Sequence, residues 1–440
     1  MEDQEIGRLS YEISPMAAIP IWTAADNIPQ EIIQDIQSLL DSRNAAKTAA
    51  ISKSWRLAWS TRPVLDFHDL RHRRHQFRAF AVKTMRRYGT DKLSLNSFSL
   101  RMDVLDEHHL AAWLVLKAIK LGATNISLRI RRSDIGPRLF ALPDEVLDSG
   151  TLASLDLHDC IIRFPVRNNV VLKWSNLKSI IFSSVITTSR DLLINFISKC
   201  TSLERVKLQN TRSYRYHGYE RASYDMIQHH KLKSLELVGY DIKENMHRHD
   251  LWPKFPFLKE LVIRDVDSEY FWPGLRICSP SLELISLHIY KNNIPNGRFD
   301  VPNIRKFEVV GTHLPNLVEF KTSSGRKWES DIQVTCQHFT QQWFSSLSKL
   351  LRQLSSSQIY LSVRMAFHHV DYRIYAGDGL PKPVVEMLKV WGGDHPQLDV
   401  HAFVNALLRR CDPKCITEFN QVHEIDVEKR DDALLQVMDQ

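Results

Sequence analysis

Cysteine and histidine are among the side chains in this sequence that could bind a metal or act as nucleophiles. Cys411 and Cys415 are four positions apart, but no second pair of cysteines accompanies them. The pairs His229-His230 and His368-His369 do not complete a ligand set, because structural zinc sites combine Cys and His side chains at characteristic spacings. We therefore interpret these residues as structural thiols and surface imidazoles, and we expect neither a metal nor another cofactor.

Sequence motifs of the common enzyme classes are missing. The chain contains no P-loop, Gly-x-Gly-x-x-Gly, Gly-x-Ser-x-Gly, His-Glu-x-x-His or kinase catalytic loop. Carboxylates and histidines are scattered along the chain, so no acid–base dyad can be identified without geometry. We expect a protein that is not an enzyme.

The amino-acid composition limits the cellular compartments and the classes of binding partner that we expect. The six cysteines are sparse and mostly isolated among 440 residues, which fits reduced thiols in the cytoplasm, the nucleus or both. No run of apolar residues is long enough to cross a membrane, and the N-terminus lacks the apolar core of a secretory signal. A net charge of +7, with 58 basic against 51 acidic residues, is only a weak signal for nucleic acid. We expect neither a membrane nor a nucleic acid as the main partner.

Residues 26–67 predict three short helices that end before Pro63. Pro29 is expected just inside the first helix, and apolar residues at 28, 32, 33, 36, 39 and 40 recur at helical spacing. Trp55 and Trp59 lie one turn apart in the third helix. A unit of this size is too small to be a stable domain alone, so we expect its apolar face to bind a partner.

From residue 90 onward, one pattern recurs: an apolar residue, two others, then apolar-x-apolar. From Leu155 to Phe307 the steps between successive apolar-x-apolar pairs are 25, 26, 29, 26, 24 and 22 residues. Leucine-rich repeats have a period of about 20–29 residues, and each repeat covers the core of its neighbour. The clear instances begin at Leu152, Leu177, Leu203, Leu232, Leu258, Leu282 and Ile304, and the weaker ones are Leu93-x-Leu95, Ile126-x-Leu128 and Leu317-x-x-Phe320.

The first module also carries a family resemblance. The run Ile28-Pro29-x-Glu31-Ile32, then Ile36 and Leu39-Leu40, then Ile51-Ser52-Lys53-x-Trp55-Arg56 resembles an F-box. The continuation Trp59-Ser60-x-Arg62-Pro63-x-Leu65-Asp66-Phe67 resembles the version in plant F-box proteins with leucine-rich repeats. In that family the F-box docks on a Skp-type adaptor, which links it to a cullin ubiquitin ligase. The resemblance implies adaptor-binding roles for Ile28, Pro29, Glu31, Ile32, Ile36, Leu39, Leu40, Ile51, Lys53, Trp55 and Arg56, with Lys53, Trp55 and Arg56 holding the C-terminal helices.

Three residues depart from the family pattern. Gln37 stands where an apolar residue is usual, Asp41 replaces a proline, and Ser54 replaces a basic residue. A buried unpaired amide costs about 1–3 kcal/mol, which is enough to weaken adaptor binding about tenfold. Two alternatives therefore stay open: a non-ligase interaction scaffold with a decayed F-box, and a helical hairpin packed on its own repeats.

The expected fold is α/β: a three-helix F-box followed by an irregular leucine-rich-repeat solenoid, with parallel strands on the concave side and helices and loops on the convex side. We expect a disordered tail over 1–25, the F-box over 26–67, a basic linking helix over 68–89 and repeats over 90–325. Divergent final repeats and a C-terminal cap follow over 326–420, and a tail over 421–440. The linking helix could instead contact nucleic acid, but its basic face lacks interleaved aromatic residues for stacking.

Side chains between and just after the apolar pairs should face the concave side of the solenoid. They carry both charge signs without forming a stripe, so they do not identify a ligand, and a curved repeat surface most often binds protein. With the resemblance, this predicts a substrate-recognition subunit that binds an unknown protein substrate; nothing selects a small-molecule receptor. The candidate substrate-binding residues are Asp156, His158, Lys207, Gln209, Glu236, Arg264, His288 and Glu308.

Overall fold

The computed structural model describes the chain from residue 28 to residue 419, with gaps. The described ranges are 28–40, 42–69, 74–103, 108–131, 139–163, 174–188, 190–215, 218–221, 230–239, 252–264, 275–290, 297–323, 325, 327–336, 340–365, 380–391 and 400–419. The predicted tails, 1–25 and 421–440, lie outside these ranges, as do His229 and the pair His368-His369.

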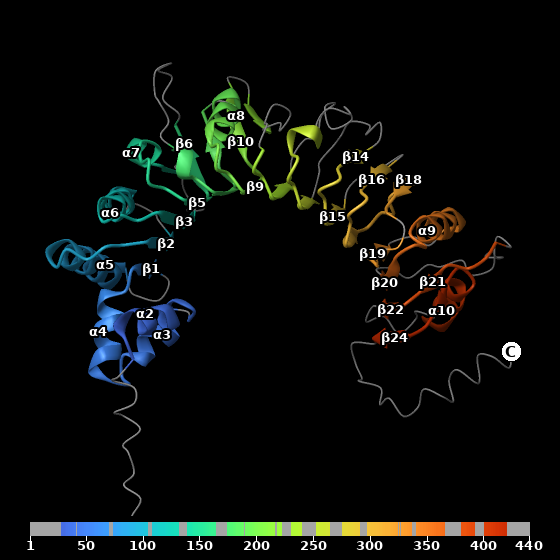
Figure 1. Ribbon diagram of the computed structural model, residues 1–440, viewed down its shortest axis with the longest axis horizontal. Coiled ribbons are helices and arrows are strands. Elements are labelled where there is room, and N and C mark those ends of the chain that lie inside the picture. The colour runs from blue at the N-terminus through green and yellow to red at the C-terminus, as the bar shows by residue number, and fades with distance from the viewer. Residues whose placement is uncertain are drawn as a thin grey trace, which may run out of the picture.

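A single curved sheet runs through most of the described chain. It contains 14 strands, and each pairs in parallel with the next one along it. Figure 1 shows that the sheet forms the inner side of an arc. The strands are β1 (Val64–His68), β2 (Ser97–Asp103), β3 (Asn125–Arg131), β5 (Ser154–His158), β7 (Ser179–Ser183), β9 (Arg205–Gln209), β12 (Ser234–Val238), β13 (Glu260–Arg264), β15 (Leu284–Ile289), β17 (Lys306–Gly311), β19 (Glu329–Cys336), β20 (Gln358–Met365), β22 (Met387–Trp391) and β24 (Ile416–Phe419).

Helices and short strands cover the outer side of the arc (Figure 1). The helices are α5 (Arg74–Thr90), α6 (His108–Lys120), α7 (Asp144–Leu147), α8 (Arg190–Lys199), α9 (Gln341–Gln353) and α10 (Val400–Leu408), with 3-10 turns at Trp174–Asn176 and Trp252–Lys254. The outer strands form three small sheets: β4 (Phe140–Ala141), β6 (Cys160–Ile162), β8 (Ile186–Thr187), β10 (Arg212–Arg215) and β11 (Gly218–Arg221); β14 (Arg276–Cys278), β16 (Gly297–Asp300) and β18 (Leu317–Lys321); and β21 (Val384–Val385) with β23 (Asp412–Pro413). We refer to residues 64–419 as the solenoid.

One continuous apolar core lies between the inner strands and the outer elements. Leu155 and Leu157 of β5 are fully buried, whereas the residues between and beside them are partly exposed, as the pleat of a strand requires. The upstream leucine of that repeat, Leu152, is buried as well, and the core extends without a break from Leu65 to Cys411. These observations agree with the expected α/β solenoid, in which each repeat completes the core of the next.

A left-handed turn repeats just after four neighbouring strands. Asp159, Ser184, Asn210 and Gly239 have φ angles of 55°, 52°, 48° and 67°. Each backbone N–H donates to the carbonyl of the next strand's last residue; that of Asn210, for example, lies 2.8 Å from the oxygen of Val238. The turns therefore extend the ladder of hydrogen bonds by one position beyond the strands.

Two weaker repeat assignments need correction. Leu93-x-Leu95 is not a strand, because the inner strand is β2, where Phe98 and Leu100 point into the core. Leu95 is instead the buried upstream leucine of that repeat. Leu317-x-x-Phe320 lies in β18, which belongs to the outer three-stranded sheet and not to the concave one.

The solenoid begins earlier in the chain than the sequence predicts. Strand β1, at 64–68, already pairs with β2, although these residues fall within or just after the range expected for the F-box. Helix α5 then buries Phe77, Ala81, Met85 and Tyr88 in the continuous core. The stretch expected to be a linking helix is therefore the outer helix of the first repeat.

Candidate functional site

Three short helices precede the solenoid, as expected. They are α2 (Gln30–Ser38), α3 (Ser42–Thr48) and α4 (Lys53–Thr61), and we call residues 28–61 the helical module. Pro29 occupies the N-cap position of α2, one residue before the predicted place. Ser52 caps α4 by accepting a hydrogen bond from the backbone N–H of Trp55 at 3.5 Å. The core of the module is small: Ile33, Trp55 and Ala58 are buried together, with Ile28 packed against them.

The helical module exposes more large apolar side chains than it buries. Leu39 is 87% exposed, Leu57 52% and Ile32 49%. The residues of α2 share one stripe, because positions three, four and seven or eight apart lie on the same side of a helix. We call this stripe the apolar patch; it comprises Ile32, Ile36, Leu39 and Leu40, while Ile51 and Leu57 are further exposed apolar side chains of the module.

The residues predicted to contact an adaptor separate into two groups. Ile28 and Trp55 face the inside of the module, so they support its fold and present little surface. Sequence analysis did not identify Leu57. Trp55 and Ala58 of α4 face inward, and the helical position between them faces outward, which could have indicated that Leu57 is exposed. The other predicted residues are exposed: Pro29, Glu31, Ile32, Ile36, Leu39, Leu40, Ile51, Lys53 and Arg56.

Gln37 does not lie on the apolar patch. Its side chain is 1% exposed, and its amide nitrogen donates to Thr48 Oγ1 at 2.8 Å and to the Trp55 carbonyl at 3.2 Å. The amide thus ties α2 to α3 and α4 and is not presented to a partner. The amide oxygen Oε1, however, is buried without a hydrogen-bond partner in the described residues, so a cost of Gln37 falls on the stability of the module and not on its exposed surface.

Helix α5 fastens the helical module to the solenoid. The Arg87 guanidinium donates to the Ser60 carbonyl, and the Tyr88 hydroxyl donates to the Arg62 carbonyl, both at 2.7 Å. Burial lowers the pKa of Arg62 to about 10 and raises the pKa of Tyr88. The Arg62 guanidinium also lies 3.6 Å from the ring centroid of Trp59. These contacts form a packed junction, which we call the α5 junction.

The structure places all eight predicted concave residues on inner strands, at positions that alternate with the buried ones. Lys207 and Arg264 both approach the Glu236 carboxylate, at 3.0 Å and 3.5 Å. Further along the arc, Ser286 donates to Glu308 at 2.7 Å. The Ser183 hydroxyl donates to the Gln209 amide oxygen at 3.3 Å, and the ring centroid of His288 lies 6.3 Å from that of Tyr290. The Lys306 ammonium lies 3.9 Å from the Glu308 carboxylate and 3.8 Å from that of Asp331.

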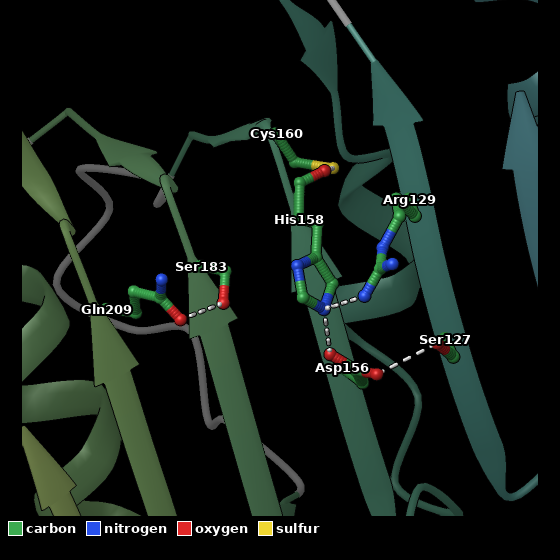
Figure 2. Close-up of polar contacts among 7 residues, drawn as sticks. All are labelled: Ser127, Arg129, Asp156, His158, Cys160, Ser183 and Gln209. Carbon is green, nitrogen blue, oxygen red and sulfur yellow. Dashed lines mark hydrogen bonds and ion pairs between the residues drawn. The ribbon is translucent and has the colours of Figure 1, made fainter. Parts of the chain in front are cut away.

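Asp156 and His158 meet near the N-terminal end of the concave face. The Ser127 hydroxyl donates to Asp156 Oδ2 at 2.9 Å, and His158 Nε2 lies 3.0 Å from Asp156 Oδ1 (Figure 2). His158 Nε2 is also 3.5 Å from an Arg129 guanidinium nitrogen. Ser127 and Arg129 were missed by sequence analysis, although they hold the same repeat positions as Asp156 and His158.

This Ser–Asp–His group is not arranged as a nucleophilic triad. A catalytic serine is hydrogen-bonded to the imidazole that deprotonates it, whereas Ser127 is bonded to the carboxylate.

The neighbouring Cys160 thiol donates to the His158 carbonyl at 3.1 Å, and burial raises its pKa far above neutrality (Figure 2). Burial likewise raises the pKa values of Cys200 and Cys411 to about 12. Recognition by charge and hydrogen bonding is the chemistry that this geometry supports.

No cofactor site is evident in the described ranges. Within them, no three or more Cys, His, Asp and Glu side chains come together as a metal site would require. Cys411 is buried while Cys415 is partly exposed, so the two thiols predicted to be structural occupy different environments. The helices described here include none that is long and apolar enough to span a membrane.

Several known proteins of Arabidopsis thaliana are similar in sequence to this chain. The chain is 25% identical over 193 residues to a putative F-box protein, covering 42% of this chain and 44% of the relative. It is 25% identical over 303 residues to an F-box/LRR-repeat protein, covering 66% of this chain and 60% of the relative. A putative F-box/FBD/LRR-repeat protein is 26% identical over 181 residues, covering 41% of this chain and 40% of the relative.

These matches confirm the resemblance found in the sequence, at low identity. The chain spans less than two thirds of the length of the relatives it matches, and less than half of two of the three. No model of a protein family matches the chain.

Proposed function

We propose that this chain, a relative of the plant F-box/leucine-rich-repeat proteins, is the substrate-binding subunit of a Skp–cullin–F-box ubiquitin ligase. In this role the helical module binds a Skp-type adaptor, and the concave face of the solenoid binds the protein to be ubiquitinated. The observation that carries the proposal is the apolar patch, which lies on a module with very little core of its own.

The apolar patch has the chemistry of a docking surface. Fully burying an exposed Leu or Ile side chain is worth about 1.5–3 kcal/mol, and each of the four side chains of the patch would contribute in proportion to its exposed part, Leu39 the most. Large exposed apolar patches on folded proteins commonly mark interaction sites. The exposed Lys53 and Arg56 of α4 add positive charge to the same module, which favours an acidic partner surface.

The concave face supplies the second half of the proposal. Its side chains are polar and mixed in charge, and they stand on a continuous, internally stabilised sheet. A rigid curved surface of this kind suits protein recognition. The ubiquitin chemistry would then belong to partner subunits, and this chain would contribute proximity between substrate and ligase, in the cytoplasm, the nucleus or both.

Co-purification with a plant Skp-type adaptor tests the proposal. We expect the full chain to capture the adaptor, and Ile36→Asp with Leu39→Asp to weaken capture by about tenfold or more, because both charges would be desolvated in the interface. Val318→Asp is the matched control, since Val318 is an apolar side chain of the solenoid that is 40% exposed.

Two outcomes would contradict the proposal: an intact chain that captures no adaptor, or an equal loss in the variant and in the control. The first would favour the interaction scaffold with a decayed F-box. Gln37 bears on that alternative only through the stability of the helical module, because its amide nitrogen is bonded within the module while its buried Oε1 has no hydrogen-bond partner in the described residues.

A further inference from the structure

The N-terminal end of the concave face holds a concentration of basic side chains. His68, Arg101, Arg129 and His158 occupy one register row across β1, β2, β3 and β5. Neighbouring strands are about 4.8 Å apart, so the two arginines stand side by side on the sheet. Both arginines are exposed. We call these four residues the basic row.

The charges of the two arginines are not neutralised within the described chain. No carboxylate whose side chain is described forms an ion pair with Arg101 or Arg129; Asp66 and Asp156 lie on diagonal register positions. Arg62 interacts electrostatically with Asp66, and His158 and Ser127 contact Asp156. Asp103 is also diagonal to Arg129, and its register partner is Arg131.

Arg129 makes one long contact on this face. A nitrogen of its guanidinium lies 3.5 Å from His158 Nε2, which is also 3.0 Å from Asp156 Oδ1 (Figure 2). An imidazole ring carries no negative charge, so this contact does not neutralise the guanidinium.

This arrangement is unfavourable for the free protein. Like charges directly opposite each other on neighbouring strands destabilise a sheet. Elsewhere on the same face charges are compensated: Lys207 pairs in register with Glu236, and Lys306 approaches both Glu308 and Asp331, which are opposite each other in register. An anion bound between the two guanidinium groups would remove the repulsion, because arginine binds carboxylate and phosphate oxygens with two donors at once.

We propose that the basic row binds an acidic peptide segment of the protein recognised by the concave face. This inference rests on the proposed function and names the substrate chemistry at that surface. A peptide fits better than a nucleic acid, because the row spans four strands and the described part of its surroundings offers no exposed aromatic side chains for stacking bases. The anionic groups can be aspartate, glutamate or phosphoserine, which share the chemistry that arginine recognises.

Binding of a fluorescent oligoglutamate peptide to the full chain, followed by anisotropy, tests this inference. We expect Arg101→Glu with Arg129→Glu to weaken binding by about tenfold or more, since each charge-assisted hydrogen bond contributes substantially. Lys389→Glu is the matched control, because Lys389 occupies the same register row near the other end of the sheet. A phosphoserine peptide and its unmodified serine counterpart, measured in parallel, distinguish phosphate from carboxylate as the source of charge.

Adaptor capture by the same variants separates this inference from the proposed function. If the chain captures the adaptor but oligoglutamate and phosphoserine peptides do not bind, or bind the double variant as well as the wild type, the inference is overturned. It is also overturned if an oligothymidylate of similar charge binds more tightly than either peptide through the same arginines. Retained adaptor capture by the double variant shows that the chain is folded.

Discussion

The helical module and the solenoid use their apolar side chains in opposite ways. In the solenoid, the inward residues of successive strands join one core that extends from Leu65 to Cys411. In the helical module, the buried cluster comprises Ile33, Trp55 and Ala58, while six large apolar side chains remain exposed. The difference indicates that the solenoid is stabilised from within, whereas the module depends on the α5 junction and, in our proposal, on a partner.

The comparison also distinguishes residues that stabilise the fold from residues that are available to bind a partner. A buried leucine contributes to folding because its removal leaves a cavity, whereas an exposed leucine loses little by truncation. Apolar substitutions should therefore affect folding in the solenoid and binding in the helical module. The predictions below test this division, from the largest expected change in stability to the smallest.

The largest effect is expected for Leu157→Ala in β5. Leu157 is fully buried between strands and outer elements, so we expect the free energy of unfolding to fall by about 2–5 kcal/mol. Leu57→Ala is the matched control from the helical module, with Leu57 52% exposed and an expected change within about 0.5 kcal/mol. Chemical denaturation followed by circular dichroism measures both. Equal losses in the two variants would break the comparison.

A smaller effect is expected for Gln37→Leu. The change removes the hydrogen bonds to Thr48 and Trp55, each worth about 0.5–1.5 kcal/mol, but it also removes the amide oxygen, which is buried without a partner in the described residues, so we expect a net loss smaller than the two bonds together. We expect destabilisation of the helical module without a gain in adaptor capture. Gln333→Leu, at an exposed position of β19, serves as the control. A rise in adaptor capture for Gln37→Leu would contradict the buried role described here.

The smallest effect is expected for Tyr88→Phe at the α5 junction. Loss of the hydroxyl removes one hydrogen bond to the Arg62 carbonyl, worth about 1 kcal/mol. Backbone amides of α4 should then exchange hydrogen faster, while those of β5 should not change. Tyr290→Phe, at a tyrosine that is 44% exposed, is the control and should leave both unchanged. Unaltered exchange in α4 would mean that the junction does not stabilise the module.

The curved sheet could be predicted because the spacing of apolar residues in the sequence is the spacing that the fold needs to bury its core. Each inner strand from β2 to β17 buries two alternating side chains and is preceded by a third, so the spacing survives even where the residues vary. Leu93-x-Leu95 was wrongly assigned to a strand because Leu95, the upstream leucine of its repeat, follows Leu93 by two residues. The two leucines therefore have the apolar-x-apolar spacing that is typical of an inner strand. The short outer strands, two to five residues long, carry too few side chains to produce a period.

The candidate sites were predictable in part, for a different reason. In α2 the apolar residues extend around more than one face, so the pattern alone does not decide that Ile33 and Gln37 turn inward while Ile32 and Ile36 turn outward. Packing against Trp55 makes that choice. On the concave face, strand alternation identified the outward positions, but the basic row depends on the register of β1, β2 and β3, which no single strand specifies.

The α5 junction has a geometric consequence for any two partners bound at once. Because Arg87 and Tyr88 of α5 bond to the Ser60 and Arg62 carbonyls, a swing of one binding surface relative to the other would have to break these hydrogen bonds. The distance between the two bound partners, called the reach below, is then set by the number of strands between their binding surfaces and not by the length of a flexible linker. One repeat inserted between β2 and β3 would lengthen that reach by about 4.8 Å along the arc, whereas one added after β24 would leave it unchanged.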